Sequence, residues 1–399
     1  MKSKHLTRRG FAQGAAAFMV MAPALAQGTA VSEKLKVGII GLGGRGRLIG
    51  RLLLEHGGYH IAALADYFSE VVRTAGESFG VDGKHCHSAL SGYQRLLDED
   101  LDAVFLETPP YCFPEHVETA VAAGMHVYIA KPLGCDVPGC LRIARAGEQA
   151  AQVGRVFLVD FQTRTDPFII EGVRRMRNGD IGPLGMLSAI YTDEGFRDPP
   201  VTDTVESRLQ HLVWVNDDAL GGGYLVNAGI HAVDLALWMA YGHPERAMGV
   251  SRTGRAEAHG DSHDLYSVTY QFSDRVVMNY QGEHVHNQFG FRANCIAQCQ
   301  AGYLTAGYST EARMYGNSTS YDGGKVVDLY NEGIRRNLRT FHQAVVQGNT
   351  SNPTIAPAVN ATLASILGRE AARKGYPLGW EDMLKENRRL EPDLSGLKV

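Results

Sequence analysis

The segment that decides the fold is Val37-Gly38-Ile39-Ile40-Gly41-Leu42-Gly43-Gly44-Arg45-Gly46, near the start of a chain of 399 residues. Its first four residues predict a short buried strand, because three of them are β-branched and apolar. The spacing Gly-x-Gly-x-x-Gly follows at once, and apolar residues then recur at helical spacing through positions 48–53. The order of strand, glycine turn and helix is typical of a dinucleotide-binding unit.

The glycines of this turn have separate roles in such a unit. Gly41 permits the tight turn, Gly43 lets the backbone approach a pyrophosphate, and Gly46 lets the helix pack against the strand. The start of the helix attracts the phosphate anion, so Gly44 and Arg45 belong to the predicted cofactor site as well. A glycine-rich turn without a nucleotide is the alternative interpretation.

The next strand, at residues 59–65, ends in Asp66. A carboxylate at this position accepts hydrogen bonds from a ribose and repels a 2′-phosphate, which predicts NAD(H) and makes NADP the less favoured cofactor. Arg45 argues against this preference for NAD(H), because its guanidinium is able to contact a phosphate.

Strand and helix patterns continue to alternate until about residue 159. The later apolar strands are expected at residues 103–106, 126–129 and 155–159, with helices at 71–79, 115–123 and 141–152. This alternation predicts an α/β fold that begins with a Rossmann domain, a doubly wound parallel sheet, which we place at residues 33–157.

The pattern changes from residue 184 to longer alternating stretches. They predict an open, mostly antiparallel sheet with strands at residues 186–191, 246–251, 266–272, 275–280 and around Ile296. Helices are expected at residues 168–178, 230–241, 330–347 and 358–374. We therefore assign residues 158–399 to an α+β domain for substrate binding and oligomerisation, with helices at its C-terminal end.

Polar and basic residues follow the strands of the predicted parallel sheet. Glu107-Thr108-Pro109-Pro110 comes directly after one strand, His116 lies on the next helix, and Lys131 follows the strand at 126–129. Because ligands of doubly wound sheets bind beyond the carboxyl ends of the strands, Thr108, Pro109, His116 and Lys131 are expected beside the nicotinamide half of the cofactor. A turn defined by its prolines is the alternative interpretation of residues 107–110, and both interpretations can hold at once.

The order of these motifs resembles the Gfo/Idh/MocA (glucose-fructose oxidoreductase/inositol dehydrogenase) superfamily. The resemblance rests on the glycine turn, Thr108-Pro109-Pro110, Lys131-Pro132, and Gly221-Gly222-Gly223 followed by Gly229-Ile230-His231-Ala232-Val233-Asp234. It implies an NAD(H)-dependent oxidoreductase acting on a carbohydrate, with Lys131 and His231 as catalytic residues. Relatives often dimerise or tetramerise through the open face of the second sheet, so a homo-oligomer is expected.

Two positions depart from the pattern of that superfamily. Ala130 stands where an acid usually precedes the lysine, and Asn227 stands where an aspartate usually precedes the histidine by four residues. An amide cannot accept a proton as a base. The resemblance therefore implies that His231 acts alone or with a tyrosine, while Asn227 contacts substrate.

Substrate contacts are expected from three further segments. Asp160-Phe161-Gln162-Thr163-Arg164 resembles the substrate-side segment of the superfamily, so Gln162 and Arg164 are candidates to bind sugar hydroxyls or a carboxylate, although a salt bridge at the domain interface explains Arg164 equally well. Tyr191-Thr192-Asp193-Glu194 and the segment 280–284 end two strands, and Tyr191 and Tyr280 are the candidates there.

The first residues resemble a twin-arginine (Tat) signal peptide. Arg8 and Arg9 precede an apolar run at residues 15–21, which is too short for a stable membrane anchor, and the run is followed by Ala24-Leu25-Ala26. We expect a signal at residues 1–26, cleavage after Ala26, and export of the folded protein by the Tat machinery to the periplasm. An ordinary disordered N-terminus is the alternative.

Export has a consequence for the chemistry, because free NAD is expected to be scarce outside the cytoplasm. We therefore predict a tightly bound cofactor whose hydride returns to the same sugar or passes to a second one. The first alternative is a redox-neutral glycosidase or epimerase. The second is a sugar- or nucleotide-binding protein without turnover.

Composition excludes other classes of function. The formal net charge of −4 and the absence of long basic runs argue against nucleic-acid binding. The six cysteines form no Cys-x-x-Cys pair and have no histidine at ligand spacing, so free thiols and no metal site are expected.

Overall fold

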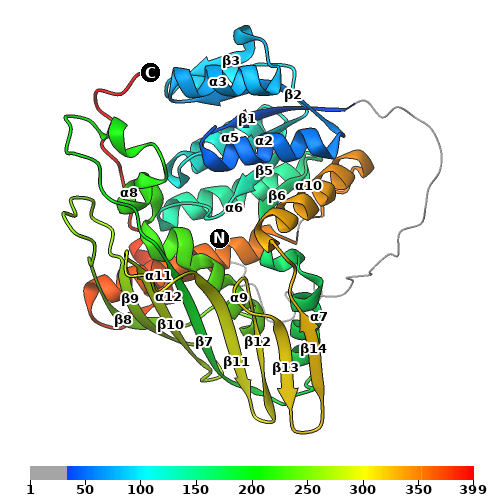
Figure 1. Ribbon diagram of the computed structural model, residues 1–399, viewed down its shortest axis with the longest axis vertical. Coiled ribbons are helices and arrows are strands. Elements are labelled where there is room, and N and C mark those ends of the chain that lie inside the picture. Colours follow the sequence, from blue (N-terminus) through cyan, green and yellow to red (C-terminus); the bar gives the residue numbers. More distant parts are fainter. Residues whose placement is uncertain (1–33, 352) are drawn as a thin grey trace, which may run out of the picture. The chain divides into compact units, whose positions relative to one another are not determined.

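A computed structural model describes residues 34–351 and 353–399, and the predicted signal peptide lies outside these residues. Residues 34–399 form one compact unit built on two β-sheets (Figure 1). The predicted combination of a parallel doubly wound sheet and a mostly antiparallel sheet is confirmed. In the described part of the chain, every helix is too short or too polar to cross a membrane.

The first sheet is parallel, with the strand order β3-β2-β1-β4-β5-β6. Its strands are β1 (Leu35–Ile40), β2 (Tyr59–Asp66), β3 (Cys86–Ser88), β4 (Ala103–Leu106), β5 (His126–Ala130) and β6 (Phe157–Asp160). The connecting helices are α2 (Gly44–His56), α3 (Ser69–Phe79), α4 (Gly92–Leu97), α5 (Phe113–Ala122) and α6 (Val137–Gln152). The strand order reverses between β1 and β4, and that is where such folds bind ligands.

The boundary expected after residue 157 falls inside β6. This strand pairs with β5 in parallel from Phe157 to Asp160, so the first sheet continues three residues beyond the expected end of its domain. The difference matters for the site, because it places Asp160 at the carboxyl edge of the sheet beside Ala130.

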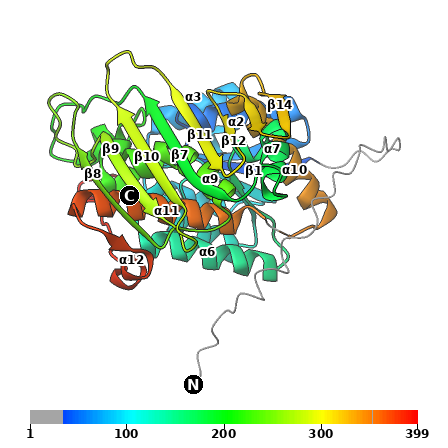
Figure 2. The same ribbon diagram turned by 90° about the horizontal axis from the view of Figure 1, so that it is seen from below.

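The second sheet has the order β14-β13-β12-β11-β7-β10-β9-β8-β15. Its strands are β7 (Leu184–Asp193), β8 (Arg246–Arg252), β9 (Leu265–Gln271), β10 (Val277–His284), β11 (Arg292–Cys299), β12 (Gly302–Gly307), β13 (Ala312–Gly316), β14 (Ser320–Gly324) and β15 (Leu378–Gly379). Only β7 and β10 pair in parallel. Figure 2 looks onto the outer face of this sheet, with α9 and α11 behind it.

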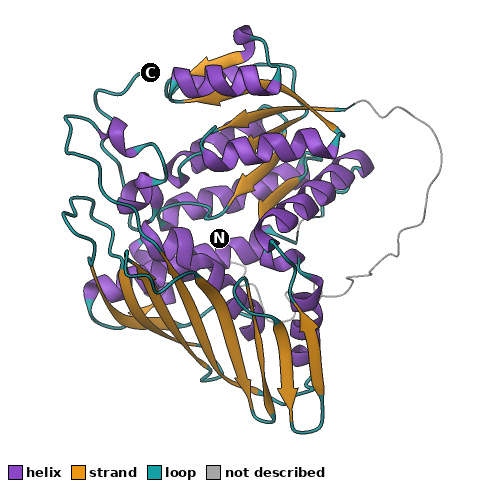
Figure 3. Cartoon of the chain, in the orientation of Figure 1, coloured by secondary structure: helices purple, strands orange, loops and turns teal. Residues whose placement is uncertain are grey.

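Helices occupy the space between the two sheets (Figure 3). The helices of the second half are α7 (Pro167–Arg177), α8 (Asp218–Gly221), the π-helix Leu225–Gly229, α9 (Ile230–Ala240), α10 (Leu329–Gln347), α11 (Ile355–Lys374) and α12 (Trp380–Glu386). Helix α9 packs on β7 and β11, and α11 packs on α9, α6 and β8. Both helices are buried around most of their circumference, as expected for helices between two layers.

Arg369 on α11 joins two segments that are distant in the sequence. Its side chain is 1% exposed, and its guanidinium donates to the carbonyl of Cys135 at 2.9 Å and to that of Gly222 at 2.8 Å. Its charge is paired with Glu370 at 2.9 Å. The loop after Lys131 and the glycine run before His231 are therefore held by one buried side chain.

Replacement of this arginine is expected to destabilise the fold. Arg369→Met leaves the Glu370 carboxylate and two carbonyls without their buried donor, which costs about 3 kcal/mol or more in free energy of unfolding. Urea denaturation followed by circular dichroism measures the loss. Lys374→Met removes a surface pair with Glu386 and should cost less than about 1 kcal/mol; equal losses in the two variants would contradict the structural role of Arg369.

Candidate active site

The glycine turn has the geometry that its sequence predicts. Gly41 has a φ of 92°, and a Cβ there would lie 2.6 Å from the backbone of Glu107 and Thr108. A Cβ on Gly46 would lie 1.8 Å from the Gly41 carbonyl oxygen, whereas a Cβ on Gly43 would meet no atom within 4 Å. Gly41 and Gly46 are thus required by packing, and Gly43 leaves the space beyond the turn open.

That space is part of a cavity of about 390 Å³ at the carboxyl ends of β1, β2 and β4. The predicted cofactor residues that line it are Gly41, Gly43, Gly44, Arg45, Asp66, Thr108, Pro109 and His116. No side chain caps the start of α2, which begins after Gly43. The first backbone N–H groups of α2 therefore suit an anion at this point.

Asp66 lies at the rim of the cavity with both carboxylate oxygens engaged. The backbone N–H groups of Leu42 and Phe68 donate to them at 2.7 Å and 3.0 Å. Burial raises the pKa of Asp66, and these hydrogen bonds oppose that rise. Each carboxylate oxygen has a second lone pair, so the group still has capacity to accept from a ribose.

His116 forms part of the wall of the same cavity. Its ring packs against Tyr93 with 4.2 Å between ring centroids, and its Nδ1 lies 3.5 Å from the Thr108 hydroxyl. Burial lowers the pKa of His116 to about 3, so the ring is neutral at physiological pH.

Arg45 lines the cavity, but its guanidinium turns away from the turn toward the ends of β4 and β6. Its Nε lies 2.8 Å from a carboxylate oxygen of Glu107, and it also forms an ion pair with Asp160. It donates to the Tyr330 hydroxyl at 2.7 Å. Burial opposes the charge of Arg45, but Glu107, Tyr330 and Asp160 outweigh it and raise the pKa. The expected phosphate contact therefore competes with two carboxylates.

Lys131 lies at the same edge of the sheet, directly after β5. Its Nζ donates to the carbonyl oxygen of Asn227 at 2.8 Å. Burial, followed by repulsion from Arg45, lowers the pKa of Lys131 to about 7, although Asp160 and Glu107 oppose the shift. The amine is thus able to gain or lose a proton near neutral pH.

His231 is 7% exposed and lies on α9 near this lysine. Burial, followed by the charges of Lys131 and Arg45, lowers its pKa, so the imidazole is neutral. Its ring stacks on Tyr191 with 6.1 Å between centroids and meets Tyr308 edge-on at 5.2 Å. Its Nδ1 is buried and has no hydrogen-bond partner in the described structure. The structure thus brings together Lys131, Asn227, His231 and Tyr191.

Three predicted substrate residues have other neighbours. Arg164 makes a bidentate salt bridge with Asp234, at 2.8 Å for the shortest contact, which is the structural role that the sequence left open. The Tyr280 side chain is 2% exposed, with its hydroxyl directly under Gly229. Gln162 is fully buried and accepts from the Tyr308 hydroxyl at 2.7 Å, so it reaches His231 only through that ring.

Sequence reasoning did not select several residues of this site. Glu107 and Asp160 stood inside quoted motifs, at the ends of strands, and that position was the available signal. Asn337 donates to Asp160 at 2.5 Å, and Tyr330 and Tyr308 complete the surroundings of Arg45 and His231. These last three come from segments far along the chain with no motif of their own.

The described residues contain no group of three or more His, Cys, Asp or Glu side chains arranged to hold a metal ion. All six cysteines are free thiols.

This fold and this cavity define a dinucleotide-binding oxidoreductase. Residues 35–161 match the model of an oxidoreductase family with an NAD-binding Rossmann fold, and residues 173–321 match the GFO/IDH/MocA C-terminal domain. The chain belongs to the GFO/IDH/MocA oxidoreductase family, which confirms the resemblance found in the sequence and the prediction of an NAD-dependent enzyme.

Individual proteins show the same likeness at lower identity. Inositol 2-dehydrogenase of Acidothermus cellulolyticus is 23% identical over 346 residues, 86% of this chain and 94% of that protein. Inositol 2-dehydrogenase 2 of Saccharopolyspora erythraea is 28% identical over 230 residues, 55% of this chain and 59% of that protein. The structure of levoglucosan dehydrogenase with NADH and L-sorbose has a TM-score of 0.72 at 18% identity, covering 88% of this chain and 100% of that one, and supports the fold.

Substitutions in the glycine turn are expected to separate packing from cofactor binding. Gly43→Ala should leave the free energy of unfolding within about 0.5 kcal/mol but weaken NADH binding at least tenfold, because the new methyl group occupies the approach to the turn. Gly46→Ala should destabilise the fold by about 1–3 kcal/mol through its clash with Gly41. Fluorescence titration with NADH and chemical denaturation measure the two effects; unchanged affinity in Gly43→Ala would contradict the assigned cofactor position.

The lowered pKa of Lys131 predicts a pH-dependent cost in stability. The unfolded chain holds the lysine proton up to pH 10.5, whereas the folded protein releases it at about 7, so the cost is full below pH 7 and falls as the pH rises toward 10. Lys131→Met should therefore stabilise the protein more at pH 6 than at pH 10, by at least about 1 kcal/mol. Denaturation at both pH values tests this, and Lys84→Met, at a lysine that is 69% exposed, is the control. A gain independent of pH would show that the lysine is not desolvated.

Proposed function

We propose that this protein is an NAD(H)-dependent oxidoreductase that acts on a sugar or sugar derivative with a tightly bound cofactor. The observation that carries the proposal is the position of Lys131, which follows β5 at the carboxyl edge of the parallel sheet, the same edge that carries the glycine-turn cavity. Lys131 is also close enough to His231 for its charge to lower the pKa of that histidine. The names of the relatives support a polyhydroxylated substrate, since they include inositol and levoglucosan dehydrogenases.

The residues of the cavity fit a dinucleotide. The uncapped start of α2 at Gly43 and Gly44 suits the pyrophosphate, Asp66 suits a ribose, and Thr108, Pro109 and the neutral His116 suit the nicotinamide side. The carboxylate of Asp66 favours NAD(H) over NADP(H). When bound, the nicotinamide supplies a reversible hydride acceptor.

The side chains of this chain supply the proton chemistry. Lys131 binds the hydroxyl oxygen on the carbon that is oxidised, and with a pKa of about 7 its Nζ can take up the hydroxyl proton and return it. His231 is neutral and has a free ring nitrogen, so it can fix a hydroxyl by a hydrogen bond without adding charge. Tyr191 and the backbone at Asn227 complete the wall around the reacting group.

A cover over the cavity supports tight cofactor binding. Residues 209–212 and Trp214 line the cavity, and the short helix before them, Val205–Arg208, is attached to its rim because the Tyr67 hydroxyl donates to Glu206 at 2.8 Å. The backbone N–H of Lys398 donates to the same hydroxyl at 3.2 Å. These contacts hold the segment against the cavity, which favours slow release of a bound dinucleotide.

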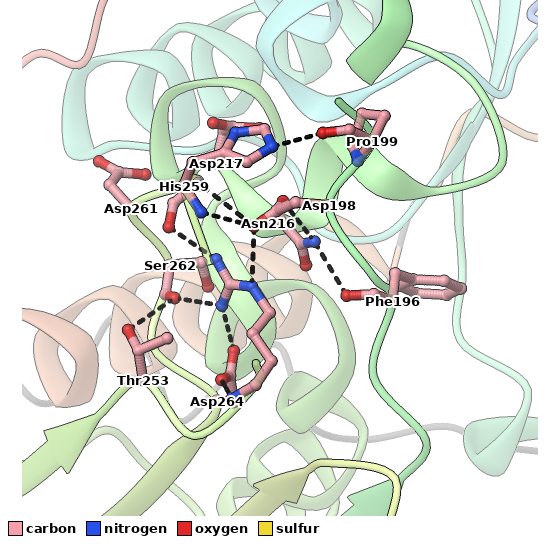
Figure 4. Close-up of polar contacts among 12 residues, drawn as sticks. Phe196, Asp198, Pro199, Asn216, Asp217, Thr253, His259, Asp261, Ser262 and Asp264 are labelled. Atoms are coloured by element: carbon pink, nitrogen blue, oxygen red, sulfur yellow. Dashed lines mark hydrogen bonds and ion pairs between the residues drawn. The ribbon is translucent and has the colours of Figure 1, made fainter. Parts of the chain in front are cut away.

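A buried ion network anchors the segment that carries the cover. Figure 4 shows the part of this network around Asp198 and Asp264. Asp198, with a side chain 1% exposed, pairs with Arg208 at 2.9 Å and with Arg255 at 3.2 Å. Arg208 also pairs with Asp217 at 2.6 Å, and Arg255 pairs with Asp264. Paired charges of this kind are costly to separate, which favours a cover that stays closed.

A closed cover and a retained cofactor also fit a redox-neutral cycle. In a glycosidase or epimerase of this type, the sugar is oxidised to a ketone and then loses the proton beside it. In a glycosidase the leaving group departs and water takes its place, whereas in an epimerase a proton returns to the opposite face, and the hydride then returns to the ketone. Release of a leaving group from a glycoside, with solvent deuterium beside the carbonyl carbon, would select this second candidate. Tight sugar binding without any product would select the non-catalytic binding protein.

The proposal includes location and assembly. We propose export of the folded, cofactor-loaded protein through the Tat machinery, supported by Arg8-Arg9, the apolar run at residues 15–21 and Ala24-Leu25-Ala26. We also propose a homo-oligomer that uses the outer face of the second sheet, which has a broad depression lined in part by Val250. Two apolar side chains of β8 are exposed, Met248 at 53% and Val250 at 67%.

Loss of either catalytic side chain should abolish turnover while the cofactor stays bound. Lys131→Ala and His231→Ala are each expected to lower kcat for sugar oxidation at least about 100-fold, with NAD(H) retained as in the wild type. Absorbance of the retained cofactor during incubation with a panel of sugars, cyclitols and anhydrosugars is the measurement, and Lys385→Ala is the surface control. Full activity in either variant would remove that residue from the mechanism.

A further inference from the structure

Asp193 and His284 form a pair that the proposed mechanism does not use. Asp193 ends β7, His284 ends β10, and these parallel neighbours place the two residues directly opposite each other. The Nδ1 of His284 lies 2.5 Å from a carboxylate oxygen of Asp193. Both therefore lie at the carboxyl end of the parallel pair β7 and β10.

His284 is held rigidly. It is fully buried, and its ring is stacked between Tyr191, with centroids 5.6 Å apart, and Tyr224, at 4.4 Å. Its Nε2 is buried without a hydrogen-bond partner in the described structure. A ring confined in this way can rotate little, so its Nδ1 fixes the position of the Asp193 carboxylate.

The pair lies next to the reacting centre. The ring of Tyr191 stacks on both His284 and His231, and its centroid lies 6.1 Å from that of His231. A single ring therefore links the two histidines. The charge of Asp193 also acts on Lys131 and favours its charged form. Asp193 is thus within electrostatic range of the residue that binds the reacting oxygen.

Exposure distinguishes Asp193 from the other carboxylates that act on Lys131. The side chains of Glu107 and Asp160 are 0% exposed, and both are paired with Arg45. The side chain of Asp193 is 29% exposed. A carboxylate has about four acceptor sites, and the His284 ring occupies one of them. Asp193 therefore retains acceptor capacity at a surface that a ligand can reach.

We propose that Asp193 is a sugar-binding residue that accepts hydrogen bonds from substrate hydroxyls, with His284 as its positioning residue. The inference rests on the proposed function and deepens it, because it selects substrates with a hydroxyl beside the carbon held at Lys131. A fixed, charged acceptor discriminates strongly against an analogue that lacks the matching hydroxyl, since the carboxylate is then left without its donor. The residue sets which sugar, and which of its carbons, is presented for oxidation.

A neighbouring pair provides a matched control. Glu194 and His286 follow Asp193 and His284 on the same two segments, but they lie 3.4 Å apart with side chains 68% and 49% exposed. Glu194→Gln removes the same charge one residue away, at a carboxylate that no buried ring holds.

The test compares sugar binding and turnover in Asp193→Asn, Glu194→Gln and the wild type. The best substrate from a panel of aldohexoses, cyclitols and anhydrosugars is used together with each of its monodeoxy analogues, and binding is measured by quenching of the retained NADH fluorescence. Asp193→Asn should raise the sugar Kd and KM at least about tenfold and change kcat less than about threefold. The monodeoxy analogue that lacks the hydroxyl bound by Asp193 should have the same Kd for the wild type and for Asp193→Asn. Glu194→Gln should have the Kd, KM and kcat of the wild type.

His284 is tested by a graded pair of substitutions. His284→Asn keeps an N–H donor near Nδ1 and should stay within about threefold of the wild-type Kd, whereas His284→Leu should lose as much affinity as Asp193→Asn. If the leucine variant does not fold, the asparagine variant and the analogue series remain decisive.

The outcomes separate the two proposals. If Asp193→Asn binds every sugar and analogue with the Kd of the wild type, this inference is wrong, whereas the proposed oxidoreductase function is unaffected. An equal loss of affinity for all analogues would also overturn it, because no particular hydroxyl would be recognised. A wild-type protein that neither binds nor converts any sugar contradicts the proposed function and this inference with it.

Discussion

The charge of Arg45 is the constraint on which the arrangement of the site depends. A guanidinium cannot lose its proton in a protein, so a largely buried one requires carboxylates around it. Arg45 stands in the glycine turn, and the carboxylates that it finds are Glu107 after β4 and Asp160 at the end of β6. Arg45 therefore connects the glycine turn with the ends of β4 and β6, and through Tyr330 with the start of α10. A single ion cluster connects the start of the cofactor cavity with the reacting centre.

The same cluster influences the charge of Lys131 and His231, the residues that we propose as catalytic. The acid that usually precedes the lysine is replaced by Ala130, yet two fully buried carboxylates still act on Lys131, because neighbouring strands deliver Glu107 and Asp160 to the same edge. Burial and the charge of Arg45 outweigh them, so Lys131 ionises near neutrality and His231 stays neutral. Burial also raises the pKa of Glu107 to about 7, so this carboxyl can hold a proton when the surrounding charge changes. Lys131 and Glu107 are thus both able to change their protonation near neutral pH, beside the permanent charge of Arg45.

The sequence predicted those parts whose signals are local. The glycine turn, the acid at Asp66 and the alternation of strands and helices each depend on residues close together in the chain, and the parallel sheet followed from them. Strands β12 to β14 were not predicted, because residues 302–324 are rich in glycine, serine and threonine and their apolar alternation is weak. The partners of Arg45 and Arg164 were beyond local reasoning, since Arg45 meets Asp160 and Tyr330 only through the folded sheet. The segments that contain Asp193 and His284 were recognised as strand ends. Their contact could not be predicted, because it depends on the register in which β7 and β10 pair.

The central claim is that a dinucleotide occupies the cavity over the glycine turn and stays there beneath its cover. Native mass spectrometry of the purified, undenatured protein tests this most directly. The account predicts one NAD or NADH per chain, a mass that is lost on denaturation and recovered as the free dinucleotide. A protein that carries no nucleotide and gains none after incubation with millimolar NAD(H) or NADP(H) would contradict it.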